Sequence, residues 1–226
     1  MKTDKLVATI EKIEAFIRPF KPPVQSFERS IRDTPLRILI SVLISSRTKD
    51  EVTHKASANL FNRADSAKKI VGLGEKRVAE LIYPVGFYRQ KAKNIIRICR
   101  QIQESGQVPG DFEELTALPG VGRKTANLVL ALAFQQPAIA VDIHVFRISR
   151  RLGWAKADKP ELVEAELKKT FPRSHWRRIN QALVGFGQTV CKPQKPRCHI
   201  CFLNGECPYY LKKKSNDQAQ KDRQDQ

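Results

Sequence analysis

Residues 118–127 read Leu-Pro-Gly-Val-Gly-Arg-Lys-Thr-Ala-Asn, and this stretch sets the fold expected for the chain. Gly120 and Gly122 can both adopt positive φ without steric cost, so they permit a tight turn. Apolar residues three apart over 112–118 predict a short helix before the turn, and spacings of three and four over 125–134 predict a second helix after it. The stretch therefore predicts two helices joined by a glycine hairpin, although a plain corner between two helices would give the same pattern.

The glycine hairpin is suited to holding a phosphate group, because the backbone N–H groups of a Gly-x-Gly turn point outward as an anion site. Lys124 follows in the first turn of the second helix, where the helix dipole and Arg123 both disfavour a charged ammonium. An uncharged lysine amine in a partly desolvated pocket is a nucleophile that can form a Schiff base. The alternative is a solvated lysine that only contacts phosphate, as is common in so basic a chain.

A lone carboxylate, Asp142, interrupts an apolar run that extends from Ala138 to Ile143. Carboxylates rarely occupy such surroundings without a partner or a task. Asp142 can cap a helix predicted over 144–152, and N–H groups of that helix would keep it ionised. An ionised carboxylate here can also stabilise positive charge on a deoxyribose ring or help to deprotonate an attacking group.

Four cysteines gather near the end of the sequence, at Cys191, Cys198, Cys201 and Cys207. Disulfides are disfavoured, because the number of cysteines is odd and no secretory signal begins the chain. A four-cysteine zinc site usually has two Cys-x-x-Cys pairs, whereas this stretch has one. Four thiolates equally suit a 4Fe–4S cluster, so the spacing alone leaves iron and zinc open. The fifth cysteine, Cys99, lies in an apolar helical pattern and is expected to be an inert core thiol.

The charge balance points to a polyanionic partner. The chain of 226 residues has 41 basic and 23 acidic side chains, which gives a formal net charge of +18. Such an excess predicts a salt-sensitive attraction to phosphates, which is independent of base sequence. No apolar run is long enough to span a membrane and no secretory signal is found, so we expect a soluble cytoplasmic protein.

Helical periodicity dominates the chain, and alternating strand patterns are scarce. Further helices are predicted over residues 6–17, 36–44, 50–61 and 87–104. Gly-Leu-Gly-Glu-Lys at 72–76 echoes 120–124, but it lacks the preceding proline and a later aspartate in an apolar run, so it predicts a helix corner. Residues 212–226 are almost entirely polar and predict a disordered tail.

Two motifs and the cysteine stretch resemble the endonuclease III family of DNA glycosylases with lyase activity. The motifs are residues 118–127 and Ala-Val-Asp-Ile-His-Val-Phe-Arg at 140–147. The resemblance implies an all-α protein with two lobes, in which the damaged base enters the cleft between them. Residues 28–136 would form a six-helix barrel domain that contains the helix-hairpin-helix at about 112–134. Residues 1–27 and 137–211 would form the iron–sulfur cluster domain.

The same resemblance implies roles for single residues. Lys124 would be the nucleophile, Asp142 its partner, and the four clustered cysteines, Cys191, Cys198, Cys201 and Cys207, the ligands of a 4Fe–4S cluster. DNA contacts are expected from Gly120, Val121, Gly122, Arg123 and Thr125 of the hairpin, and from Lys192, Lys195 and Arg197 of the cysteine loop. The expected enzyme is a monomer that binds double-stranded DNA, removes oxidised pyrimidines of the thymine glycol type, and nicks the abasic site by β-elimination.

Two further segments are similar to family loops that fill the space left by an extruded nucleotide. They are Ser-Ser-Arg-Thr-Lys-Asp at 45–50 and Val-Gly-Phe-Tyr at 85–88. The family commonly has glutamine where this chain has Arg47, beside Ser46, and leucine where it has Phe87. Arginine can donate to a base edge and phenylalanine can wedge between bases. The alternatives are a phosphate contact for Arg47 and a core aromatic for Phe87.

Three other functions fit parts of the sequence. A glycosylase of the same superfamily that acts on mismatched normal bases is the nearest, and such relatives often lack the lysine. A noncatalytic DNA-binding module would not need both Lys124 and Asp142. An electron carrier built on the cluster would not need the basic excess or the hairpin.

Overall fold

The computed structural model describes residues 3–25 and 34–222, and the chain divides into two compact units. One unit is Pro23–Ala140, and the other joins Met1–Pro22 to Val141–Gln226. The described residues form helices and turns and contain no strand, which confirms the all-α prediction. None of the helices in this described part is long and apolar enough to cross a membrane.

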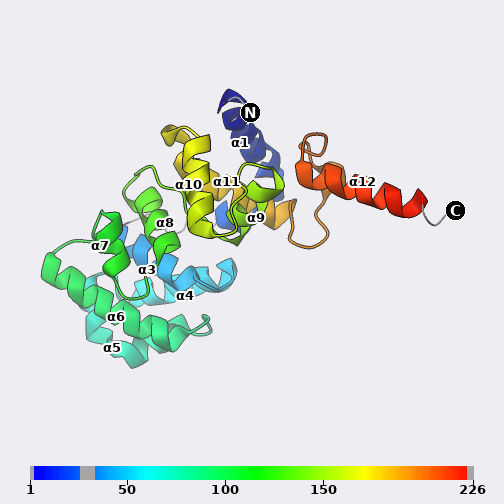
Figure 1. Cartoon of the computed structure of the whole chain (residues 1–226). Helices are drawn as coiled ribbons and strands as arrows, with labels where there is room; N and C mark the ends of the chain where they lie inside the picture. Colours follow the sequence, from blue (N-terminus) through cyan, green and yellow to red (C-terminus); the bar gives the residue numbers. More distant parts are fainter. Residues whose placement is uncertain (1–2, 26–33, 223–226) are drawn as a thin grey trace. The chain divides into compact units, whose positions relative to one another are not determined.

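The unit Pro23–Ala140 is built around one central helix, α3 (Pro35–Ser45). Thr34 caps α3 by accepting a hydrogen bond from the Arg37 N–H, and every residue from Ile38 to Ile44 is buried. The surrounding helices are α4 (Asp50–Arg63), α5 (Ala67–Ile82), α6 (Tyr88–Ser105), α7 (Phe112–Ala117) and α8 (Arg123–Ala133). Helices α4, α6 and α8 pack against α3, and α5 lies along α6 (Figure 1). A helix that is apolar all round is thereby covered by its neighbours.

Helix α5 contains the predicted corner. Gly74 has φ 74° and ψ 163°, so the helix breaks there and resumes in a new direction. In the hairpin the positive φ falls on Gly120, which corresponds in the echo to Gly72 and not to Gly74. The two glycine turns therefore differ in geometry, and the echo of sequence is not a repeat of structure.

The second unit packs the first helix of the chain against later helices. Its elements are α1 (Thr3–Ile17), η1 (Arg18–Phe20), α9 (Ile143–Arg151), α10 (Pro160–Thr170), η2 (Arg173–His175), α11 (Trp176–Thr189), η3 (Cys198–Ile200) and α12 (Pro208–Asp222). Helix α11 contacts both α1 and α9, and its apolar residues from Ile179 to Phe186 are buried (Figure 1). The apolar side of α1, spaced four, three and four apart, closes onto this core.

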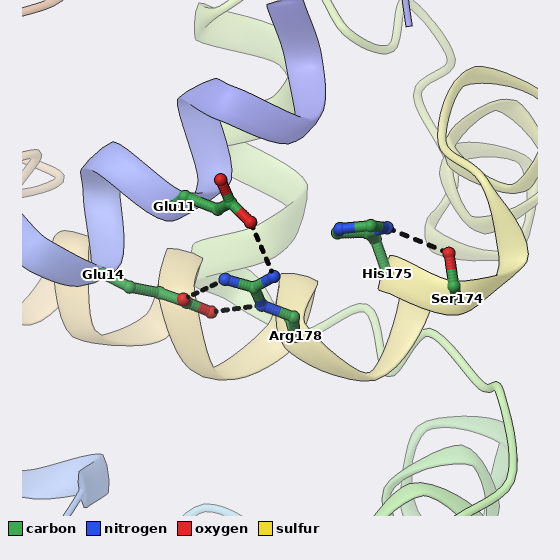
Figure 2. A network of polar contacts seen from close by, with 5 residues as sticks. All are labelled: Glu11, Glu14, Ser174, His175 and Arg178. Atoms are coloured by element: carbon green, nitrogen blue, oxygen red, sulfur yellow. Dashed lines mark hydrogen bonds and ion pairs between the residues drawn. The ribbon is translucent and has the colours of Figure 1, made fainter. Parts of the chain in front are cut away.

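A polar network joins α1 to α11 at the edge of that core (Figure 2). Arg178 donates from Nη2 to Glu14 Oε2 at 2.5 Å and from Nε to Glu14 Oε1 at 3.1 Å, and its Nη1 reaches Glu11 at 3.1 Å. This fork raises the pKa of Arg178 above its ordinary value, chiefly through the hydrogen bond to Glu14. Residues far apart in sequence are thus fastened together within one unit.

The predicted domain limits and tail can be compared with these units. The first predicted domain limit, between residues 27 and 28, lies outside the described residues. The second domain limit is predicted between residues 136 and 137, whereas the structure changes from one unit to the other between Ala140 and Val141. The tail expected to be disordered from Lys212 instead continues α12 as far as Asp222. All described side chains from Leu211 to Gln218 are exposed, so helix propensity and not packing accounts for this extension. Residues 223–226 lie outside the described part.

Candidate active site and cysteine loop

The glycine hairpin between α7 and α8 has the predicted form. Gly120 has φ 81°, and the side-chain amide of Asn94 lies so close that a Cβ at Gly120 would collide with it. The turn is fixed by a hydrogen bond from the Val121 N–H to the Leu118 carbonyl at 3.1 Å. Gly122 has φ −94°, so only one of the two glycines uses the left-handed region. Asp111 starts α7 by capping Glu113 and Glu114.

The N-terminus of α8 is open to an anion. Gly122 is its N-cap residue, and glycine has no side chain with which to cap the helix. The positive end of the helix dipole is therefore available to a phosphate. Arg123 is exposed and its guanidinium lies 5.0 Å from the centre of the Phe112 ring, so α7 holds this charge beside the hairpin. Thr125 is half-buried.

Lys124 lies in the first turn of α8 with an exposed side chain. The role of nucleophile, which the resemblance implies for Lys124, stays a prediction.

Asp142 is the N-cap of α9, as predicted. Its Oδ1 accepts hydrogen bonds from the His144 N–H at 2.9 Å and from the Val145 N–H at 2.8 Å, and the residue is half-buried. Both cap bonds go to one oxygen, so Oδ2 takes no part in the cap. Asp142 and Lys124 belong to different units of the chain.

The two loops that carry Arg47 and Phe87 meet within the unit Pro23–Ala140. Arg47 has φ 54° and Phe87 has φ 58°, and the Arg47 guanidinium lies 5.6 Å from the centre of the Phe87 ring. The Phe87 side chain is 64% exposed, so the reading of Phe87 as a core aromatic is wrong. Ser46 and Arg47 are also exposed. Arg47 and Phe87 thus expose their side chains from backbone positions with positive φ, which non-glycine residues rarely adopt.

A buried lysine in α6 was not predicted. Lys91 is only 7% exposed, and its ammonium donates to the carbonyls of Ile44 at 2.7 Å and Ser46 at 2.5 Å and to the hydroxyl of Thr48 at 3.2 Å. Burial lowers the pKa of Lys91 to about 8. A signal existed in the sequence, because Lys91 falls in line with Ile95 on the apolar face of its helix.

The four clustered cysteines line one small apolar cavity together with Phe186, Val190 and Tyr210. None of the four is in a disulfide. Burial, and then the neighbouring thiols, raise the pKa of Cys198, and burial raises that of Cys201 to about 11. Thiolates gathered here therefore need a positive centre between them. The donor set and the apolar lining fit an iron–sulfur cluster. Among the described residues, no three acidic, histidine or cysteine side chains are arranged to hold a single metal ion.

Two arginines of α9 fasten the loop that begins at Cys191. Arg147 Nη2 donates to the Cys191 carbonyl at 2.9 Å. Arg151 donates to the carbonyls of Lys192 at 2.8 Å and Pro193 at 2.9 Å, approaches the Cys191 sulfur at 3.4 Å, and lies over the Tyr209 ring. The loop is therefore held by main-chain acceptors, which its sequence does not reveal.

Three loop residues predicted to contact DNA are placed as follows. Lys195 and Arg197 are exposed, and Lys192 is half-buried. Lys195 has φ 47°, and Arg197 precedes η3. The fixed loop thus carries basic side chains on its surface.

Comparisons with known proteins agree with this geometry. Residues 40–173 match the model of the HhH-GPD superfamily of base excision DNA repair proteins. Residues 191–207 match the iron–sulfur binding domain of endonuclease III, and this range begins at Cys191 and ends at Cys207.

Relatives of known name include endonuclease III of Thermotoga maritima, which is 47% identical over 193 residues, covering 84% of this chain and 91% of the relative. The endonuclease III-like protein 1 of Gallus gallus is 41% identical over 76% of this chain and 63% of its own length. A solved trapped covalent intermediate of endonuclease III with DNA is similar with a TM-score of 0.83 and 31% identity, over 94% of this chain and 99% of that one. A thermostable thymine-DNA glycosylase gives a TM-score of 0.69 with 26% identity, over 91% and 99%.

Proposed function

Because this chain belongs to the endonuclease III family of the HhH-GPD superfamily, we propose that its substrates are oxidised pyrimidines of the thymine glycol type in duplex DNA. The chain is a base excision repair DNA glycosylase and abasic-site lyase, it binds DNA, and it carries a 4Fe–4S cluster. We further propose that it works as a monomer in the compartment that holds the cell's DNA.

Binding begins with the charge of the chain. The formal net charge of +18 attracts the duplex over its phosphates and gives an affinity that falls with salt. The hairpin around Gly120 and the N-terminus of α8 then hold one backbone phosphate near the lesion. The damaged nucleotide must leave the base stack before its sugar can react, because C1′ is shielded within the duplex.

Lys124 is the proposed nucleophile. Its amine lone pair forms a bond to C1′, the glycosidic bond breaks, and the departing base takes up a proton. Opening of the sugar ring leaves a Schiff base between Nζ and C1′. Loss of a proton from C2′ then expels the 3′ phosphate by β-elimination, which nicks the strand. Asp142 stabilises the positive charge on the sugar and assists the movement of protons, using the oxygen that does not cap α9.

The four clustered cysteines are the proposed cluster ligands. When bound, the cluster supplies a positive centre that keeps the four sulfurs ionised and orders the loop between them. Arg147 and Arg151 hold the start of that loop through its main chain. The exposed Lys195 and Arg197, with Lys192, then contact phosphates from a fixed position.

One observation carries the nucleophile assignment: an exposed lysine stands in the first turn of a helix whose N-cap residue is glycine. The test is borohydride treatment with a duplex that contains thymine glycol or an abasic site. Wild-type protein should become covalently linked, and Lys124→Gln should not. Lys76→Gln is the matched control, since Lys76 is the exposed lysine at the equivalent position of the echo, and it should link like wild type. A cross-link that persists in Lys124→Gln would refute the assignment.

Mismatched normal bases are a second candidate class of substrate, because of Arg47 and Phe87. Both side chains are exposed and lie together, where the family commonly has glutamine and leucine. A guanidinium and an aromatic ring can contact and replace a base differently from that pair, which makes the base opposite the lesion, and therefore a mismatch, the feature to test. A panel of thymine glycol, uracil, abasic and G·T duplexes separates the two. Faster release of thymine from G·T than of thymine glycol would favour mismatch repair.

A further inference from the structure

Lys91 forms a link between the two loops that carry Arg47 and Phe87. Its ammonium donates to the carbonyls of Ile44 and Ser46, and its backbone N–H makes the ordinary helical hydrogen bond to the carbonyl of Phe87, the N-cap residue of α6, at 3.0 Å. The Ser46 carbonyl belongs to the peptide that enters Arg47. The Lys91 side chain therefore joins the peptide beside Arg47 to the first turn of the helix that begins after Phe87.

The surroundings of Lys91 leave little freedom in this link. The third donor contact of the ammonium is to Thr48 Oγ1 at 3.2 Å, on the far side of Arg47 in sequence. No carboxylate contributes to these contacts, and burying a lysine against neutral acceptors is costly. Gly86 packs so tightly against the turn that a Cβ there would lie 2.8 Å from the Arg47 carbonyl. Both loops are thus held in contact at their backbones.

Arg47 and Phe87 both need this support. Each is a residue other than glycine with positive φ, a conformation that persists only where surrounding contacts impose it. Their side chains are exposed, and they touch each other through a cation–π contact. If either turn relaxed, the pair would separate and each side chain would have to be ordered again when DNA binds.

We propose that Lys91 is a positioning residue that holds Arg47 and Phe87 as one rigid pair, and that this pair fills the duplex opening and discriminates among the bases opposite the lesion. This inference rests on the proposed function, because it assigns to the pair the space left by the extruded nucleotide. Lys91 itself contacts no DNA and acts only through the two turns.

The experiment uses substrates with and without a base opposite the lesion, so it separates the positioning of Arg47 and Phe87 from the reaction of Lys124 with the sugar. Single-turnover cleavage is measured on thymine glycol duplexes with each of the four bases opposite, and borohydride trapping is measured on an abasic site in a single strand. Lys91→Met should lower the ratio between the best and the worst opposite base by roughly tenfold, whereas trapping on the single strand should stay within about twofold of wild type.

Two variants serve as controls for the lysine. Lys91→Arg keeps a charged donor and should retain most of the discrimination. Lys93→Met removes an exposed lysine from the same helix and should behave as wild type. If Lys91→Met does not fold, Thr48→Val removes one acceptor of the ammonium and Gly86→Ala pushes on the Arg47 carbonyl, and each should lower the ratio in the same direction.

Each outcome decides the matter. Equal loss of activity on the duplex and on the single strand in Lys91→Met would mean that Lys91 only stabilises the fold. An unchanged ratio between the best and the worst opposite base would mean that Lys91 does not hold Arg47 and Phe87 together. Either result overturns the inference. If borohydride links wild-type protein covalently to neither substrate, the proposed function is overturned. If wild-type protein is linked but Lys91→Met keeps the same ratio between opposite bases, only this inference is overturned.

Discussion

Arg147 donates from Nη2 to the carbonyl oxygen of Cys191 at 2.9 Å, and so fastens the cysteine loop to the helix that Asp142 begins. The same guanidinium reaches His144 at 3.2 Å, and burial lowers the pKa of Arg147 below its ordinary value. A buried acceptor that loses its donor costs about 1–3 kcal/mol.

Arg147→Met should therefore weaken the cysteine loop. We expect a loss of about 1–3 kcal/mol in the free energy of unfolding and a lower iron content per chain. Thermal unfolding and the iron absorbance of purified protein measure the two effects. Arg150→Met, which removes an exposed arginine from the same helix, is the control and should change neither. Full iron content in Arg147→Met would contradict the expected role.

The two glycines of the hairpin should respond differently to alanine. Gly120→Ala forces a Cβ onto a residue with φ 81° and against Asn94, so we expect a loss of about 1–3 kcal/mol of stability. Gly122→Ala meets no atom within 4 Å and should change stability by less than about 0.5 kcal/mol. Urea unfolding without DNA measures both. Equal destabilisation by the two substitutions would show that the turn is not as described.

Arg178→Met tests how firmly α1 is joined to α11. The guanidinium is 37% exposed and Glu14 28% exposed, so water screens the pair and we expect a loss of only about 1 kcal/mol. The loss should shrink at high salt, because ionic strength weakens exposed charge pairs. Arg173→Met, an exposed neighbour in η2, is the control. Urea unfolding at low and at high salt is the measurement, and a loss that is independent of salt would argue against an ionic contribution.

Lys91 should make stability depend on pH in a defined direction. Burial lowers the pKa of Lys91 to about 8, whereas the unfolded chain keeps the proton until about pH 10.4. Between these values the unfolded state binds more protons, so the contribution of Lys91 to the free energy of unfolding rises with pH. Below about pH 8 both states are protonated and the contribution is flat.

Comparison with Lys91→Met isolates that contribution. The free energy of unfolding of wild type relative to this variant should increase from about pH 8 to about pH 10 and stay constant from about pH 6 to about pH 8. Denaturant unfolding of both proteins across this range provides the measurement. A relative stability that falls above pH 8 would mean that the folded state favours the charged form.

The sequence predicts some parts of the fold because local chemistry determines them. The apolar run of α3 is so continuous that only burial explains it, and Asp142 has the flanking residues of an N-cap. Gly120 was identified as a turn glycine, but the reason that it must be glycine, the closeness of Asn94, comes from another helix. Contacts between helices leave no local trace in the sequence.

Other features depend on the same kind of long-range contact. The position of Lys91 on the apolar face of its helix can be read from the sequence, but its three acceptors, at the end of α3 and in the turn that follows, cannot. Phe87 is exposed although aromatic residues usually enter cores, and the guanidinium beside its ring comes from Arg47, forty residues earlier in the sequence. The arginines that hold the cysteine loop bind main-chain carbonyls, which carry no mark of residue type.

The burial of Cys99 has a practical consequence for chemical labelling. Its side chain is fully covered, and burial raises the pKa of its thiol to about 12, while the other four cysteines lie in the cluster loop. Alkylating reagents attack thiolates, so on native protein stripped of iron they would modify only the loop. Modification of Cys99 then requires the Pro23–Ala140 unit to open. One chain therefore contains two separate chemical reporters, one for departure of the metal cluster and one for unfolding of the helical unit.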